Sequence, residues 1–81
     1  MTISNPLGLH ARPSVKLIEC VRKFEATVWI SYQEQEFLID SLLDLLSLCI
    51  PHGATITLKA EGRDADEVLA EFTQLNTLQI I

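Results

Sequence analysis

The sequence lacks several features that would assign it to a common class of protein. No apolar run approaches the ~18 residues of a membrane-spanning helix, and the opening residues MTISNPLG have neither the basic nor the apolar stretch of an export signal. The two cysteines, Cys20 and Cys49, are far apart and form no CxxC pair, so we interpret them as small apolar residues and expect no metal site. We therefore expect a cytoplasmic protein that is not inserted into a membrane and has no cofactor.

Basic residues are also few. The chain has 6 lysines and arginines against 11 acidic residues, a net charge of −5. This balance argues against a nucleic-acid partner, because contacts to phosphate supply most of the affinity for nucleic acids. Four of the basic residues nevertheless lie close together in the sequence: Arg12, Lys16, Arg22 and Lys23. This cluster comes just after His10, in a chain that is otherwise acidic.

The apolar content is sufficient for one folded domain. With 81 residues, of which 48% are apolar, the chain can bury one core but cannot house a large cleft. Strand-like alternation is found in residues 2–4, 26–32, 36–40 and 54–60, and helical spacing in residues 11–23, from Ser41 towards Pro51, and after Asp64. The order βαββαβα predicts an α+β two-layer, open-faced sandwich over residues 1–81. Its four-stranded antiparallel sheet would carry three helices on one face.

Three local details are predicted together with this fold. The connector 33–35 lacks the Asn-Gly or Asp-Gly of a tight hairpin, so we expect a looser loop. Ser41 should cap the second helix, and residues 51–53 should end it. Asp64, with Glu67, should cap the third helix.

Trp29 and Leu38 are expected on the outer face of the sheet, because Phe37 and Ile39 point inward. One interpretation is that neighbouring side chains partly shield them, since isolated exposed hydrophobic residues are common. The alternative is a contact surface for a homodimer. We expect a monomer and keep the homodimer through Trp29 and Leu38 as the alternative.

The residues that could carry chemistry concentrate around His10, where a turn meets the first helix. Unpaired N–H groups and the positive end of the helix dipole stabilise an anion at this point. Arg12 can bind a phosphate through two N–H groups, and a neutral imidazole is a nucleophile near pH 7. A lone histidine before a helix is also commonly a surface or capping residue. The local residues alone leave both interpretations open.

The six residues Gly8-Leu9-His10-Ala11-Arg12-Pro13 resemble the active-site signature of the HPr family, the histidine phosphocarriers of the bacterial phosphoenolpyruvate-dependent phosphotransferase system. The likeness extends to the element order and to Lys23-Phe24, Asp40-Ser41-Leu42-Leu43 and Gly53-Ala54. It implies that His10 accepts a phosphoryl group from enzyme I on Nδ1 and that Arg12 stabilises it. An enzyme IIA domain would then receive the group, in sugar transport or in a regulatory branch. Such a phosphohistidine carrier is not itself an enzyme.

The resemblance also implies a docking site for partner proteins. It assigns partner contact to Leu42, Leu43 and Leu46, with Lys16 as a further contact, whereas Leu45 and Leu48 are expected to point inward.

Ser41 matches the serine that an HPr kinase phosphorylates in many family members, although it is also a plain helix cap and two acidic residues, Asp40 and Asp44, flank it here. The alternative function is therefore a regulatory interaction protein that acts through Ser41 or through docking, without flux through His10. Cys49 stands where the family often has glycine, which leaves the choice of partner open.

Overall fold

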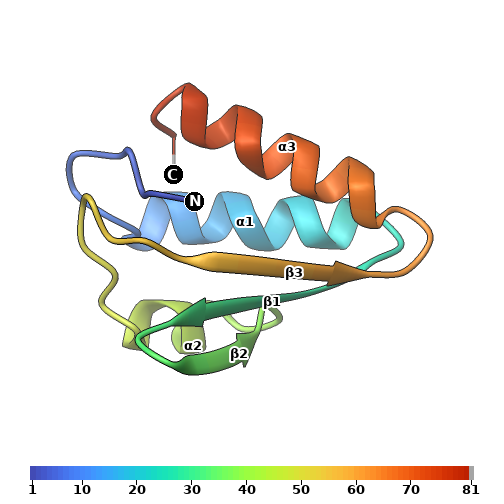
Figure 1. Cartoon of the computed structure of the whole chain (residues 1–81), viewed down its shortest axis with the longest axis horizontal. Helices are drawn as coiled ribbons and strands as arrows, with labels where there is room; N and C mark the ends of the chain where they lie inside the picture. Colours follow the sequence, from blue (N-terminus) through green and yellow to red (C-terminus); the bar gives the residue numbers. More distant parts are fainter. Residues whose placement is uncertain (81) are drawn as a thin grey trace.

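The computed structural model describes residues 1–80 and contains three helices and three strands. Their order is α1 (Ala11–Lys23), β1 (Thr27–Tyr32), β2 (Gln35–Leu38), α2 (Leu42–Ser47), β3 (Thr57–Glu61) and α3 (Ala65–Thr77). The strands form one antiparallel sheet in the order β2-β1-β3. Helix α1 packs against α3 on one side and α2 on the other (Figure 1). The predicted open-faced α+β sandwich is confirmed.

The N-terminal segment differs from the predicted first strand. Thr2 and Thr55 form an isolated antiparallel bridge. On either side, the amide of Ile3 donates to Ala54 at 2.9 Å and the amide of Ile56 donates to Met1 at 2.8 Å. The segment thus lies where a fourth strand would lie, but within residues 1–80 the sheet itself has three strands. The pairing stays short because the chain turns at residues 5–7.

The predicted inward faces of the strands and helices meet in one core. Helix α1 buries Leu17 and Ile18, and α3 buries Val68 and Phe72, as their periodicity predicted. Apolar side chains that are almost completely buried come from every layer: Ile3, Leu17, Val28, Ile30, Ile39, Leu45, Ile56, Val68 and Phe72. Burial of this apolar surface is the main driving force for folding of such a chain.

The hairpin between β1 and β2 is tighter than predicted. Tyr32 pairs directly with Gln35, so the loop consists of Gln33 and Glu34 alone, with φ angles of 51° and 66°. Two-residue loops with both residues at positive φ match the right-handed twist of the flanking strands. The expectation of a looser loop was wrong, because strand twist imposes this geometry even on residues that adopt it poorly.

Two helix ends also differ from the prediction. Helix α2 ends at Ser47, ahead of the predicted stop at residues 51–53, and Cys49 follows with a left-handed φ of 51°. A left-handed residue just after a helix commonly terminates it. Asp64 lies at the start of α3, but its carboxylate accepts from the amide of Glu25 at 2.8 Å instead of capping the helix. The predicted N-cap position of Asp64 is confirmed, but the side-chain capping bond expected with Glu67 was wrong.

The outer face of the sheet is partly covered by its own side chains. Trp29 pairs with Leu38 on one side and Lys59 on the other. The Lys59 ammonium lies 4.5 Å from the centre of the Trp29 ring and 3.5 Å from the Glu36 carboxylate. Lys59 therefore shields the tryptophan, while Leu38 stays exposed.

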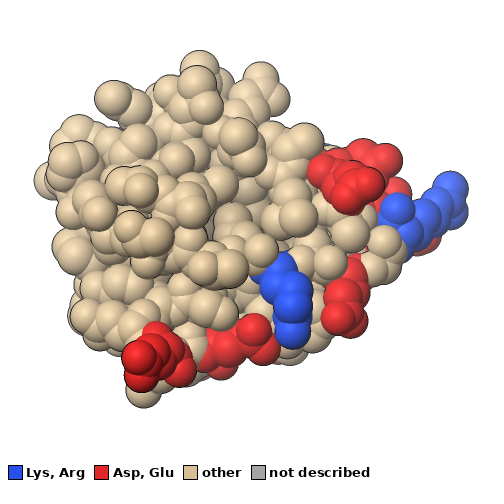
Figure 2. Space-filling model, in the orientation of Figure 1, with Lys and Arg blue, Asp and Glu red and all other residues tan. Residues whose placement is uncertain are grey.

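Charge is distributed unevenly over the molecule. On the face drawn in Figure 2, charged side chains gather along the lower margin and beside the turn between β3 and α3. The area over the N-terminal segment and the end of α3 carries neither basic nor acidic residues. Within residues 1–80, no helix combines the length and the apolar character that crossing a bilayer requires.

Candidate functional site

His10 is the N-cap residue of α1 and has an extended backbone, with φ −94° and ψ −163°. Its main chain starts the helix, since the carbonyl accepts from the amide of Ser14 at 3.0 Å. Its side chain makes no capping hydrogen bond and is partly exposed. The imidazole is therefore accessible and is not needed to close the helix end.

The turn that leads to this histidine is held by hydrogen bonds on both sides. The carbonyl of Asn5 accepts from the amide of Gly8, and its side-chain oxygen accepts from the amide of Leu7, both at 2.9 Å. The amide of Leu9 donates to the carbonyl of Ile50 at 2.8 Å. Gly8 has a φ of +75°, and a Cβ atom there would lie 2.5 Å from the Ile50 oxygen. Only glycine fits at this point.

The C-terminal end of α3 braces the same segment. Asn76 accepts from the amide of Ser4 at 3.1 Å and donates through Nδ2 to the carbonyl of Thr2 at 2.8 Å. The Ser4 hydroxyl also bonds to both the side chain and the carbonyl of Asn76. Further along, Nδ2 of Asn5 donates to the carbonyl of Ile80 at 3.2 Å. Residues more than 70 positions apart in the chain thus position the turn before His10.

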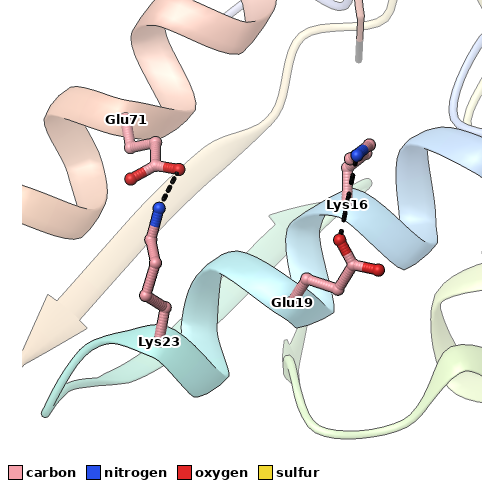
Figure 3. Close-up of polar contacts among 4 residues, drawn as sticks. All are labelled: Lys16, Glu19, Lys23 and Glu71. Atoms are coloured by element: carbon pink, nitrogen blue, oxygen red, sulfur yellow. Dashed lines mark hydrogen bonds and ion pairs between the residues drawn. The ribbon is translucent and has the colours of Figure 1, made fainter.

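A shallow depression of about 370 Å³ lies beside the histidine. It is lined by Asn5, Leu7, His10, Arg12, Lys16 and Ile80. Among the described residues 1–80, no aspartate or glutamate lines it. Within residues 1–80, none of the ion pairs involves Arg12, and Lys16 pairs with Glu19 at 3.9 Å (Figure 3). Arg12 is therefore available to an anion placed in this depression, and Lys16 is held there only by a long, exposed ion pair.

The charge pattern at the start of α1 is the reverse of that in the other helices. The first turn of α1 has no acidic residue and carries Arg12, whereas α2 has Asp44 and α3 has Asp66 and Glu67 there. Negative charge at a helix N-terminus is stabilising by roughly 0.3–1 kcal/mol, and a cation in that position opposes the dipole. This end of α1 is therefore built to receive an anion from outside.

Comparison with known proteins agrees with this geometry. A family model described as "PTS HPr component phosphorylation site" matches residues 1–77. The chain belongs to the HPr family.

Relatives and solved structures place the chain among phosphocarriers. It is 44% identical over 69 residues to the phosphocarrier protein NPr of Shewanella violacea, covering 85% of this chain and 76% of that protein. A crystal structure of HPr from Thermoanaerobacter tengcongensis matches with a TM-score of 0.92 at 28% identity, over 99% of this chain and 90% of the other. A structure described as an HPr dimer from the same organism matches with a TM-score of 0.80 at 27% identity, over 100% and 93%. The resemblance seen in the sequence is confirmed, and with it a phosphocarrier role in the phosphotransferase system.

In this HPr-family chain, several large apolar side chains are exposed, and one of them, Leu7, lines the His10 depression. Leu7 and Leu43 are each 77% exposed, and Val15 on α1 is also exposed. Of the residues assigned to docking, Leu43 points outward, Leu46 is partly exposed, and Leu42 is partly used by the core. Leu45 is buried and Leu48 packs against the core, as expected.

Sequence reasoning missed Leu7 and Val15 as members of this surface. Leu7 lies in a turn without periodicity, and Val15 is an apolar residue on the solvent side of α1, where Glu19 follows it one turn later. For Val15 the sequence did offer a signal, because an apolar residue lies on the otherwise polar face of its helix.

Ser41 is the N-cap of α2 in this HPr-family structure, and its hydroxyl accepts from the amide of Asp44 at 3.5 Å. The cap predicted from the sequence is thereby confirmed, although the bond is long. The serine is partly exposed. It lies at the start of the short helix that carries Leu42, Leu43 and Leu46.

The two cysteines have different surroundings. Cys20 is buried between α1 and α3, and burial, together with the charge of Glu71, raises the pKa of its thiol to about 11. Glu71 also bonds to Lys23 at 2.6 Å, which raises the pKa of that ammonium (Figure 3). Cys49 is exposed. In the described part of the chain, no group of three or more His, Cys, Asp or Glu residues lies close enough together to hold a metal ion.

Proposed function

We propose that this chain, as a single domain over residues 1–81, is a cytoplasmic phosphocarrier that accepts a phosphoryl group on His10. Enzyme I, charged from phosphoenolpyruvate, would supply the group, and an enzyme IIA domain would receive it, in sugar transport or in a regulatory branch. The observation that supports this most directly is an accessible imidazole at the start of a helix whose first turn holds Arg12 and no acidic residue.

The transfer itself needs few groups from the protein. The lone pair of a His10 ring nitrogen, Nδ1 by resemblance to the family, attacks the phosphorus of the phosphohistidine on enzyme I. A new N–P bond forms while the old N–P bond breaks, and the ring nitrogen of the donor keeps that electron pair. Phosphoryl transfer depends mainly on positioning and on stabilisation of charge. The amides at the helix start and Arg12 would supply the stabilisation, and the braced turn would supply the positioning.

Donor and acceptor must both face His10, so they would use one docking surface in turn. We assign this surface to Leu42, Leu43 and Leu46, with Lys16 at its edge, and add the exposed Leu7 and Val15. Exposed apolar residues around a polar reactive group are typical of protein-binding sites. No catalytic activity of the chain itself is required, because each partner brings its own reactive group.

Regulation through Ser41 is a separate proposal. An HPr kinase would phosphorylate this partly exposed hydroxyl at the start of α2, where a helix N-terminus favours a phosphate. The phosphate would add negative charge beside Asp44 and next to the docking leucines, and would repel an acidic partner. A chain that acted through this switch alone would not need His10 and Arg12 together, so we rank it second.

Phosphorylation by purified enzyme I tests the main proposal. Incubation with phosphoenolpyruvate and enzyme I should add one acid-labile phosphoryl group per chain, measured by intact mass under alkaline conditions. His10→Ala should abolish it, whereas His52→Ala, which changes the other histidine of the chain, should leave it unchanged. Labelling that survives in His10→Ala, or a wild-type chain that accepts no phosphoryl group, would overturn the proposal.

A further inference from the structure

Arg12 and Lys16 lie one turn apart on the same face of α1. Residues at i and i+4 are neighbours on a helix surface, and like charges at this spacing disfavour the helix. Both side chains line the depression beside His10, and in the described part of the chain no acidic side chain lines it with them. Within residues 1–80, the depression therefore presents two cations and no carboxylate beside one histidine.

The partner of Lys16 holds it only loosely. Its ammonium lies 3.9 Å from Glu19, and the two side chains are 58% and 63% exposed, so the pair contributes little. Lys23 on the same helix shows the contrast, because it bonds to Glu71 of α3 at 2.6 Å (Figure 3). A lysine ammonium on a flexible stem can leave such a weak exposed pair for a stronger anion nearby.

We propose that Lys16 is a second cation that contacts the phosphoryl group on His10 and, with Arg12, holds it from the side of α1. The inference rests on the proposed function and adds to it. When His10 carries a phosphoryl group, a charge of nearly −2 enters the depression. Arg12 and Lys16 are then both attracted to this anion, and the attraction outweighs the repulsion between the two cations. Lys16 would then set how strongly this carrier retains its phosphoryl group, a role distinct from contact with a partner.

An equilibrium competition separates these two roles. Wild-type and Lys16→Gln chains, one of them labelled with nitrogen-15, are mixed in equal amounts with limiting phosphoenolpyruvate and a trace of enzyme I. Because enzyme I is only a catalyst here, the final distribution depends on the stability of the two phosphorylated chains and not on how well each docks. Wild type should hold on the order of fivefold more phosphoryl groups than the variant, the size expected for one nearby charge in water.

Two further variants complete the measurement. Lys59→Gln removes the same charge from β3, on the outer face of the sheet, and should share phosphoryl groups equally with wild type. Lys16→Arg keeps the charge and should restore most of the wild-type share. Thermal unfolding of each variant checks that it is folded.

The outcomes are distinct. An equal distribution between wild type and Lys16→Gln would overturn the inference and leave Lys16 with partner contact alone. A loss as large in Lys59→Gln as in Lys16→Gln would also overturn it, because the effect would then come from net charge. Failure of the wild-type chain to accept any phosphoryl group from enzyme I would overturn the proposed function, and this inference with it.

Discussion

The amide of Leu9 donates a hydrogen bond of 2.8 Å to the carbonyl of Ile50, which joins the turn before His10 to the segment after α2. This contact helps to fix His10 and α2 relative to one another. Gly8 makes the contact feasible, because its missing side chain lets the two backbones approach.

Gly8→Ala should therefore destabilise the protein and slow phosphoryl transfer. The new Cβ would lie 2.5 Å from the Ile50 oxygen, and alanine is strained at a φ of +75°. We expect a loss of about 2–4 kcal/mol in the free energy of unfolding, measured in urea. Gly53→Ala is the matched control, since φ is +83° there but no atom lies within 4 Å of the added Cβ. It should cost only about 1 kcal/mol. Equal costs for the two variants would show that the close approach at Ile50 does not matter.

Arg12→Gln should slow transfer while leaving the fold at least as stable. Arg12 is exposed and opposes the dipole at the start of α1, so its removal should raise the free energy of unfolding by about 0.3–1 kcal/mol. Phosphoryl transfer from enzyme I should nevertheless fall by about tenfold or more, because a charge-stabilising donor is lost. Stopped-flow transfer kinetics and urea unfolding measure the two effects.

Arg22→Gln is the control for the effect on stability. Arg22 lies in the last turn of α1, where a cation is favourable, so its removal should lower stability by a similar small amount. If Arg12→Gln transferred phosphoryl groups as fast as wild type, Arg12 would not be the counter-ion of the phosphoryl group.

The hairpin between β1 and β2 tests whether the left-handed backbone angles in its turn cost stability. Gln33 and Glu34 both adopt left-handed backbone angles that asparagine and glycine adopt more readily. The double variant Gln33→Asn, Glu34→Gly should raise the free energy of unfolding by about 1–2 kcal/mol without changing phosphoryl transfer. The matched double variant Gln35→Asn, Glu36→Gly, inside β2, should instead lower the free energy of unfolding. An unchanged urea midpoint in the turn variant would mean that the turn carries no such strain.

These examples indicate where sequence reasoning succeeded and where it failed. Periodicity reflects burial, and burial is what the core requires, so the stripe of Leu17 and Ile18 and the alternation around Val28 and Ile30 were predictable. Turn and cap geometry depends on partners elsewhere in the chain. Asp64 binds the amide of Glu25 instead of its own helix, and strand twist forces Gln33 and Glu34 into a tight turn.

Some residues of the candidate site could likewise be predicted from the sequence, and others could not. His10 and Arg12 lie in one short motif, and its resemblance to the HPr signature singled them out, whereas the local residues alone left a surface or capping histidine open. The hydrogen bonds that Asn76 and Ile80 form with the turn before His10 join opposite ends of the chain, so no local sequence pattern could predict them. Leu7 escaped notice because a turn has no hydrophobic period.

Because of the buried thiol of Cys20, the stability of the folded protein should decrease at alkaline pH. Its pKa rises from 9.0 to about 11 in the folded protein, so the folded state keeps the proton over a range in which the unfolded state loses it. The unfolded state therefore binds fewer protons between pH 9 and 11, and stability falls as the pH rises through this window. The Cys20→Ala variant has no thiol at this position, so its stability should not show this decrease between pH 9 and 11. The difference in unfolding free energy between wild type and Cys20→Ala should shift against wild type above pH 9, and a constant difference from pH 8 to 11 would contradict the raised pKa.

The outer face of the sheet is the surface on which a homodimer through Trp29 and Leu38 would depend. Lys59 stacks on Trp29 and pairs with Glu36, so the tryptophan is already shielded within one chain. Leu38, which is 40% exposed, is then the one large apolar side chain exposed on this face within residues 1–80, and a single such residue is too little for a stable dimer. Sedimentation velocity should give the same monomer profile for wild type and for Trp29→Ser at micromolar concentration. A faster-sedimenting wild type that reverts to monomer in Trp29→Ser would instead establish the homodimer through Trp29 and Leu38. The control is Leu78→Ser, at the exposed residue that follows α3, which should leave such a dimer intact.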